Sequence, residues 1–324
     1  DINGAINASG EIIAASLDIS GNVDVDGTSN LDIVDIDGAV DMASTLVVAS
    51  TINTVGITGP KTNFVGSMLI SNDAGTGTLN AASNNTGFGN EVFDDLTSGD
   101  ANTGVGAQAL TKLTTGTDNT AVGQASLDAL TTGDTNTAVG ANAGGALTSG
   151  SANTAVGNDA LETATTGANN TGIGAFALRV NTADDNTAVG NQSLIASTTG
   201  ANNVAVGKNS MHKNTSGANN VAIGSLTLDA ATTANNNTAV GQGAMSGTTT
   251  GADNVAVGLS ALYSNTTASN NVAVGGAALF ANTTGEYNVA VGATAGDALT
   301  TGSVNTAVGY NTLGVATTAA NNTA

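Results

Sequence analysis

The sequence predicts an all-β fold, a parallel β-roll or β-solenoid built from 17-residue coils. A unit that starts Asn-Thr/Val-Ala/Gly-Val-Gly repeats along most of the chain in equal steps, except for one shorter step from Asn170 to Asn186. A period this short holds one coil of a solenoid, not a domain. β-Branched residues and glycine fill each unit and no apolar 3.6 period persists, which disfavours helix. The anchor asparagines are Asn85, Asn102, Asn119, Asn136, Asn153, Asn170, Asn186, Asn203, Asn220, Asn237, Asn254, Asn271, Asn288, Asn305 and Asn322.

Composition limits the kind of core and the kind of partner. The 324 residues include 3 Tyr, 5 Phe and no Trp, so a large aromatic core is excluded. With a net charge of -20 and only 5 Lys plus Arg, nucleic acid and anionic membranes are poor partners. The absence of cysteine excludes disulfides and thiolate metal sites. No apolar run approaches the length of a membrane helix, and no signal peptide is visible.

The chain divides into three regions. In residues 1–66, apolar and acidic residues alternate with the period of half-buried strands, which predicts an acidic β-strand shaft. Residues 67–84 are a degenerate first coil, longer than the others by one position, in which Ile70 takes the place of Val139. Residues 85–324 are the array of repeats. Because the chain starts without Met and stops inside a new repeat, we expect it to be a piece of a longer protein.

The positions of the repeat, numbered from its Asn, have distinct physical roles. Position 5 is Gly in all 14 full copies, which indicates a positive φ or a close backbone approach. The Asn at position 1 fits a stacked amide ladder, and the Thr found at position 13 in all 14 copies fits a hydroxyl ladder along a strand. Positions 4 and 9 supply the large apolar groups of the expected core. We assign structural roles to Asn119, Val122, Gly123, Leu127, Thr131, Asn203, Val206, Gly207, Asn254, Val257 and Gly258.

Each coil is expected to hold two short strands and two turns. A rise of about 4.8 Å per coil gives a rod of roughly 65–70 Å. Burying one large apolar group contributes roughly 1.5–3 kcal/mol, whereas ordering the backbone of one coil costs on the order of 17–30 kcal/mol. A partner surface along the whole length would help to offset that cost. We therefore predict an elongated homotrimer in which position 4 or position 9 faces the shared axis.

No catalytic residue is predicted, and we do not expect an enzyme. The one histidine, His212, has no Ser or Asp partner indicated by position. The acidic pairs Asp94-Asp95 and Asp184-Asp185 fall at turns, where solvated acids are the simpler interpretation than glycosidase chemistry. Threonine arrays also occur on ice-binding solenoids. Here, however, the paired threonines adjoin a Gly turn and would point to different faces, so we favour a role at the corner of the coil.

An acidic cluster in the shaft is the candidate metal site. Calcium prefers clustered oxygen ligands, although the stretch lacks the full spacing of an EF-hand and its downstream Glu. A plain acidic strand face is the alternative. No other cofactor is expected. The candidate ligands are Asp24, Asp26, Asp32, Asp35 and Asp37.

Two families share the repeat. The segments Asn203–Ser210 and Asn220–Gly224 resemble the Asn-Ser-Val-Ala-Ile-Gly repeats in the heads of trimeric autotransporter adhesins, which form left-handed parallel β-rolls packed as trimers. The segment Asn119–Thr135 is similar over its full length to a repeat of bacteriophage tail-fibre and spike proteins. The acidic stretch Leu17–Gly27 resembles the shafts of phage fibres. The 17-residue period favours the phage fibre, because adhesin coils are usually shorter.

The resemblance implies a structural role in host attachment. The expected function is that of a tail-fibre segment in a virion, which extends towards the host and helps to present receptor binding. The partner would be a host-cell receptor or glycan, contacted through regions outside this chain. The alternatives are a bacterial surface adhesin that binds its ligand along the β-roll, and a subunit of an extracellular filament.

Overall fold

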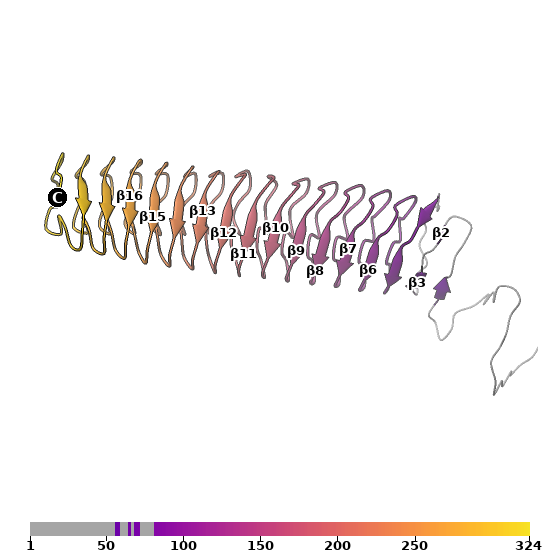
Figure 1. Ribbon diagram of the computed structural model, residues 1–324. Coiled ribbons are helices and arrows are strands. Elements are labelled where there is room, and N and C mark those ends of the chain that lie inside the picture. The colour runs from indigo at the N-terminus through magenta and orange to yellow at the C-terminus, as the bar shows by residue number, and fades with distance from the viewer. Residues whose placement is uncertain (1–55, 59–63, 66–67, 72–80) are drawn as a thin grey trace, which may run out of the picture. The chain divides into compact units, whose positions relative to one another are not determined.

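The computed structural model describes residues 56–58, 64–65, 68–71 and 81–324. Over these ranges it contains strands and turns and no helix. Residues 81–324 form an elongated solenoid in which each coil adds one strand to a long sheet (Figure 1). The strands are β1 Gly56–Thr58, β2 Phe64–Val65, β3 Met68–Ser71, β4 Ala82–Ser83, β5 Thr86–Phe88, β6 Thr103–Val105, β7 Thr120–Val122, β8 Thr137–Val139, β9 Thr154–Val156, β10 Thr171–Ile173, β11 Thr187–Val189, β12 Val204–Val206, β13 Val221–Ile223, β14 Thr238–Val240, β15 Val255–Val257, β16 Val272–Val274, β17 Val289–Val291 and β18 Thr306–Val308.

The strands confirm the predicted parallel β-solenoid. From β5 to β18 they follow one another in the sheet in sequence order, each parallel to the next. β3 pairs in parallel with β5 and places Ile70 opposite Phe88, which is the spacing expected for the longer first coil. β1 closes this edge as an antiparallel neighbour of β3, and β2 pairs with β4 in a separate two-stranded sheet.

The shortened coil keeps the register of the sheet. Thr171 pairs with Thr187, one position closer in sequence than in the other coils, and the next pair returns to the ordinary spacing. Asn170 donates from Nδ2 to the carbonyl of Ala183, the contact that its neighbour Asn153 makes with Gly167 at position 15. The missing residue is therefore the one at position 14, in a turn, where its loss leaves the strand undisturbed.

The prediction of two strands per coil was wrong. Each coil has one strand of three residues, and turns make up the rest. Non-glycine residues at positions 7, 9 and 17 adopt positive φ; in the Asn119 coil these are Ala125, Leu127 and Thr135, with φ of 50°, 51° and 58°. Left-handed backbone costs a bulky residue of the order of 1–3 kcal/mol. Leu127 offsets that cost because its side chain is completely buried.

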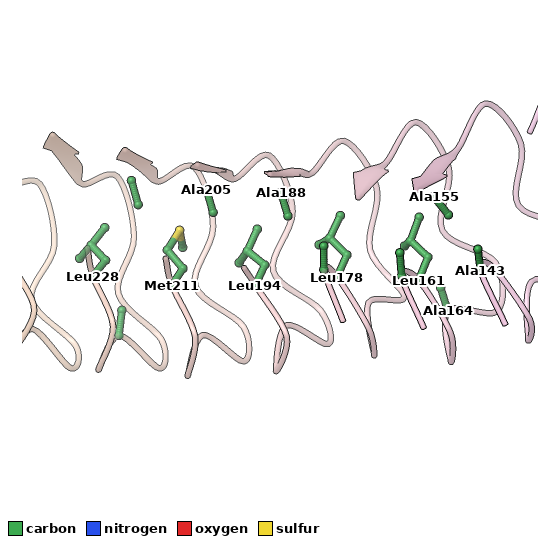
Figure 2. Close-up of a cluster of buried hydrophobic side chains, with 14 of the residues drawn as sticks. Ala143, Ala155, Leu161, Ala164, Leu178, Ala188, Leu194, Ala205, Met211 and Leu228 are labelled. Carbon is green, nitrogen blue, oxygen red and sulfur yellow. The ribbon is translucent and has the colours of Figure 1, made fainter. Parts of the chain in front are cut away.

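The core is a narrow column inside the coils. Its main parts are the alanine at position 3 of the strand and the leucine or methionine at position 9, both fully buried in most coils. Figure 2 shows Leu178, Leu194 and Met211 in a row, with Ala188 and Ala205 pointing towards them from the strands. Position 9 therefore lies inside each coil and cannot face a shared axis. Position 4 was wrongly assigned to the core, since Val122 and Val257 are each 37% exposed.

The predicted asparagine ladder runs along the solenoid. Asn203 donates its backbone N–H and its Nδ2 to Oδ1 of Asn186, at 3.0 and 3.1 Å. Its Nδ2 also donates to the carbonyl of Gly217, at 2.9 Å. Its own Oδ1 accepts the equivalent two bonds from Asn220. Asn119 and Asn254 make the same contacts in their coils. Each of these buried amides is thus satisfied without water.

The glycine at position 5 has both properties that its invariance in the repeat suggests. Gly123, Gly207 and Gly258 have φ of 139°, 135° and 142°. A Cβ on Gly207 would lie 2.5 Å from the carbonyl oxygen of Gly224 in the next coil. No L side chain fits that approach without displacing backbone.

The threonine at position 13 stabilises a turn, not a strand. Thr131 donates its hydroxyl and its backbone N–H to the carbonyl oxygen of Thr148 in the next coil, at 2.9 and 2.8 Å. The expected hydroxyl ladder is therefore a ladder of hydroxyl-to-carbonyl bonds. Because these hydroxyls are already engaged, they hold successive turns in register and do not form a free array on the surface.

Candidate interaction surface

The outer face of the long sheet carries a continuous stripe of side chains, all of them β-branched except Phe88. Alternate residues of a strand point to opposite faces, so the buried alanine at position 3 forces positions 2 and 4 outward. The burial of β7 and β12 follows this pattern, with only the central residue buried. We call the outward residues of β5 to β18 the outer stripe.

The outer stripe contains no charged residue. Position 4 is Val, Ile or Phe in every strand, and Val139, Ile223 and Val274 are 39%, 40% and 36% exposed. Position 2 is Thr or Val throughout. Extended apolar surface of this kind is uncommon on a soluble monomer and marks an interaction site.

The residue type at position 2 changes halfway along the stripe. It is threonine in the first seven strands and mainly valine afterwards, whereas position 4 stays apolar from end to end. In order, position 2 is occupied by Thr86, Thr103, Thr120, Thr137, Thr154, Thr171, Thr187, Val204, Val221, Thr238, Val255, Val272, Val289 and Thr306.

The charged side chains lie off the sheet, at positions 10 and 11 among others. Arg179 pairs with Glu162 of the preceding coil at 2.9 Å, and Lys112 pairs with Asp95 at 3.4 Å. Burial raises the pKa of Asp128, and the backbone N–H groups of Asp128 and Ala129 act in the opposite direction. With its pKa raised, Asp128 holds its proton more tightly in the folded chain, so its contribution to stability decreases as the pH rises.

His212, Asp184 and Asp95 make side-chain contacts with a neighbouring coil, whereas Oδ1 of Asp94 is buried without a hydrogen-bond partner among the described residues. His212 Nδ1 lies 4.0 Å from Oδ1 of Asp229. Asp184 accepts a bond from the backbone N–H of Ala168 at 2.8 Å, in the turn that includes Asp185. Asp94 lies in a turn beside the ion-paired Asp95. The structure therefore places these residues at separate coils along the solenoid.

The candidate metal ligands lie outside the described residues. Asp24, Asp26, Asp32, Asp35 and Asp37 all precede Gly56, where the described part of the chain begins. Within that described part, no group of three or more His, Cys, Asp or Glu side chains could hold a metal ion.

A second apolar cluster lies off the outer stripe, towards the C-terminus. The rings of Tyr263 and Phe280, from successive coils, stack with centroids 5.2 Å apart and planes 7° from parallel. Leu259, on the same coil as Tyr263, and Leu226, two coils earlier, are also exposed. A Cβ on Gly243 would meet the ring of Tyr263 at 3.6 Å, so a glycine adjoins this ring where most coils carry a larger side chain. We call the stacked rings of Tyr263 and Phe280 the lateral cluster.

The sequence named position 4 as one of two positions that could face a partner copy, but it also placed position 4 in the core, and it gave no signal for the lateral cluster. The residues at positions 3 and 4 both suit a strand, so strand propensity does not show which of them faces the core. Position 4 was placed in the core only because its side chain is the larger. The frequent Asn and Asp at position 17, such as Asp118, Asn202 and Asn219, were a usable signal of left-handed turns.

In the ranges that the structure describes, no helix is long and apolar enough to span a membrane. Comparisons with protein-family models, curated proteins and solved structures find no match to this chain.

Proposed function

We propose that this chain is a non-enzymatic structural segment of a fibre, in which three copies pack along the outer stripe. The stripe is the observation that carries the proposal, because it is uncharged along every strand from β5 to β18 while the chain has a net charge of -20. Copies with the same strong charge repel one another, so close approach is favoured along a face that carries none. The stripe offers such a face over the length of the solenoid.

The energetics support self-association. Burying the exposed part of each position 4 side chain adds on the order of 0.5–1 kcal/mol per coil. Because the same contact repeats in every coil, these small contributions to the free energy of association add up along the sheet. The resemblance to trimeric adhesin heads and phage fibres supports three copies around one axis, and position 4 is the part of the repeat available to face it.

The biological role that we propose is that of a phage tail-fibre segment. Strands β5 to β18 give a rod of roughly 65–70 Å at about 4.8 Å per coil. Such a rod sets the distance between a virion and the host receptor or glycan. Contact with that receptor is assigned to regions outside this chain. The phage assignment is supported by the similarity of Asn119–Thr135 to phage repeats over a full unit.

Light scattering after size exclusion tests the assembly. We expect a mass of three chains, each of 31.0 kDa, because the outer stripe is buried between copies. A concentration series shows whether the species is stable on dilution. A mass of one chain at all concentrations would contradict the assembly and leave a single-chain solenoid.

The lateral cluster favours a second candidate function, that of an adhesin that binds its ligand along the β-roll. Aromatic side chains are enriched at binding sites, and Tyr263 and Phe280 are 42% and 39% exposed. Replacing Tyr263 with alanine should lower binding of the chain to host cells at least tenfold if this function is correct. Exposed Thr199 replaced with alanine serves as the control. Unchanged binding in Y263A would exclude the lateral cluster as the binding site.

A further inference from the structure

The array of repeats divides into two halves, and the outer stripe has a different chemistry in each. Residues 85–202, here the Thr half, present threonine at position 2 of all seven strands. Residues 203–324, the Val half, present valine at five of seven. Because position 4 is apolar in both halves, the difference between them lies at position 2.

A threonine hydroxyl and a valine methyl behave differently in a protein interface. The methyl gains from leaving water, whereas the hydroxyl loses its bonds to water unless it finds a partner. The side chains of the stripe beside each position 2 threonine are other threonines and the apolar residues Val, Ile and Phe, since the stripe has no amide or carboxylate. Contacts made by the Thr half therefore retain water, and contacts made by the Val half exclude it.

The charged side chains are also distributed unequally between the two halves. The Thr half carries eleven acidic and two basic side chains, a net charge of -9. The Val half carries four acidic and two basic side chains, a net charge of -2. Copies that pack along the outer stripe bring the charged turns beside the sheet nearer to one another, and salt screens the repulsion between such charges over roughly 8 Å at physiological ionic strength. Within the repeats, repulsion between copies is therefore concentrated in the Thr half.

We infer that copies of the chain are held together mainly by the Val half, and that assembly starts there and proceeds towards the N-terminus. The inference rests on the proposed function and gives the fibre a defined order of assembly. Once the Val halves have aligned the chains, the Thr halves of the copies pack against one another through a contact that retains water. Packing of the Thr halves against one another depends on salt, since it brings together most of the negative charge of the repeats.

The test compares the same substitution at the same repeat position in each half of the full chain. Val139 in the Thr half and Val274 in the Val half are both at position 4, and they are 39% and 36% exposed. We expect V274D to raise the dissociation constant of the assembly roughly 100-fold or more, and V139D to raise it less than roughly 10-fold. Sedimentation equilibrium across a concentration series in physiological salt gives both values.

A second pair of variants, with a milder substitution, covers the case in which aspartate disturbs the strand itself. V274T and V139T keep the β-branched shape, and we expect roughly 10-fold and less than roughly 3-fold effects. Equal losses in the two halves, or a larger loss from the Val139 variants, would overturn the inference while leaving the trimer intact. A wild-type chain that is monomeric throughout would overturn the proposed assembly and this inference together.

Discussion

Replacing Gly275 with alanine should lower the free energy of unfolding by more than about 3 kcal/mol. Gly275 has a φ of 136°, and a Cβ placed on it would lie 2.5 Å from the carbonyl carbon of Gly292. The substitution therefore strains the backbone and pushes apart two coils that stack through that turn. Chemical denaturation followed by circular dichroism measures the loss, and hydrogen exchange locates it around β16 and β17.

The adjacent residue supplies the matched control. A Cβ on Gly276 would meet no atom within 4 Å, and this glycine does not have a positive φ. G276A should therefore be neutral or slightly stabilising, because alanine restricts the unfolded chain. Equal free energies of unfolding for G275A and G276A would contradict the idea that position 5 requires glycine because successive coils approach closely there.

Replacing Asn203 with aspartate should cost roughly 2–4 kcal/mol near neutral pH. The amide nitrogen of Asn203 donates to Oδ1 of Asn186 and to the carbonyl of Gly217. A carboxylate would place an oxygen against both acceptors, in a site with no solvent exposure. Burial and the facing oxygens favour the protonated form in the folded chain, so stability should recover as the pH falls towards 4 and decrease as it rises.

The exposed Asn191 provides a control with the same chemical change. Its Nδ2 donates at 3.3 Å to the carbonyl of Ala175 at the surface, where water can replace the contact. N191D should change the free energy of unfolding by less than about 0.5 kcal/mol and add little pH dependence. A pH profile for N203D that matched that of N191D would contradict the buried amide ladder.

The repeat itself revealed those features that depend on one residue type. Only glycine fits position 5, and a buried amide ladder needs a side chain that both donates and accepts, so Gly123 and Asn119 were informative in the sequence alone. Periodicity likewise predicted the parallel stack and the place of Ile70 opposite Phe88.

The direction of the strand side chains could not be predicted in the same way. Alternation fixes that positions 3 and 4 point to opposite faces but not which face is inside. The interior is too narrow for two rows of large residues. Alanine at position 3, such as Ala188, leaves the room that Leu178 and Leu194 fill from the opposite side (Figure 2). Val189 and its equivalents at position 4 therefore point outward. Left-handed leucines such as Leu127 were missed because tertiary packing overrides their local preference.

The direction of the bonds between coils determines how the solenoid carries tension. Strand pairing and the Asn ladder join each coil to the next, so these bonds lie along the rod and a pull on its two ends loads them lengthwise. One fully extended coil spans roughly 56–61 Å, against about 4.8 Å when stacked. Each coil that peels from an end therefore lengthens the tether by roughly 50 Å. A chain loaded in this way yields in small equal steps, which lets it absorb a sudden pull while the remaining coils stay folded.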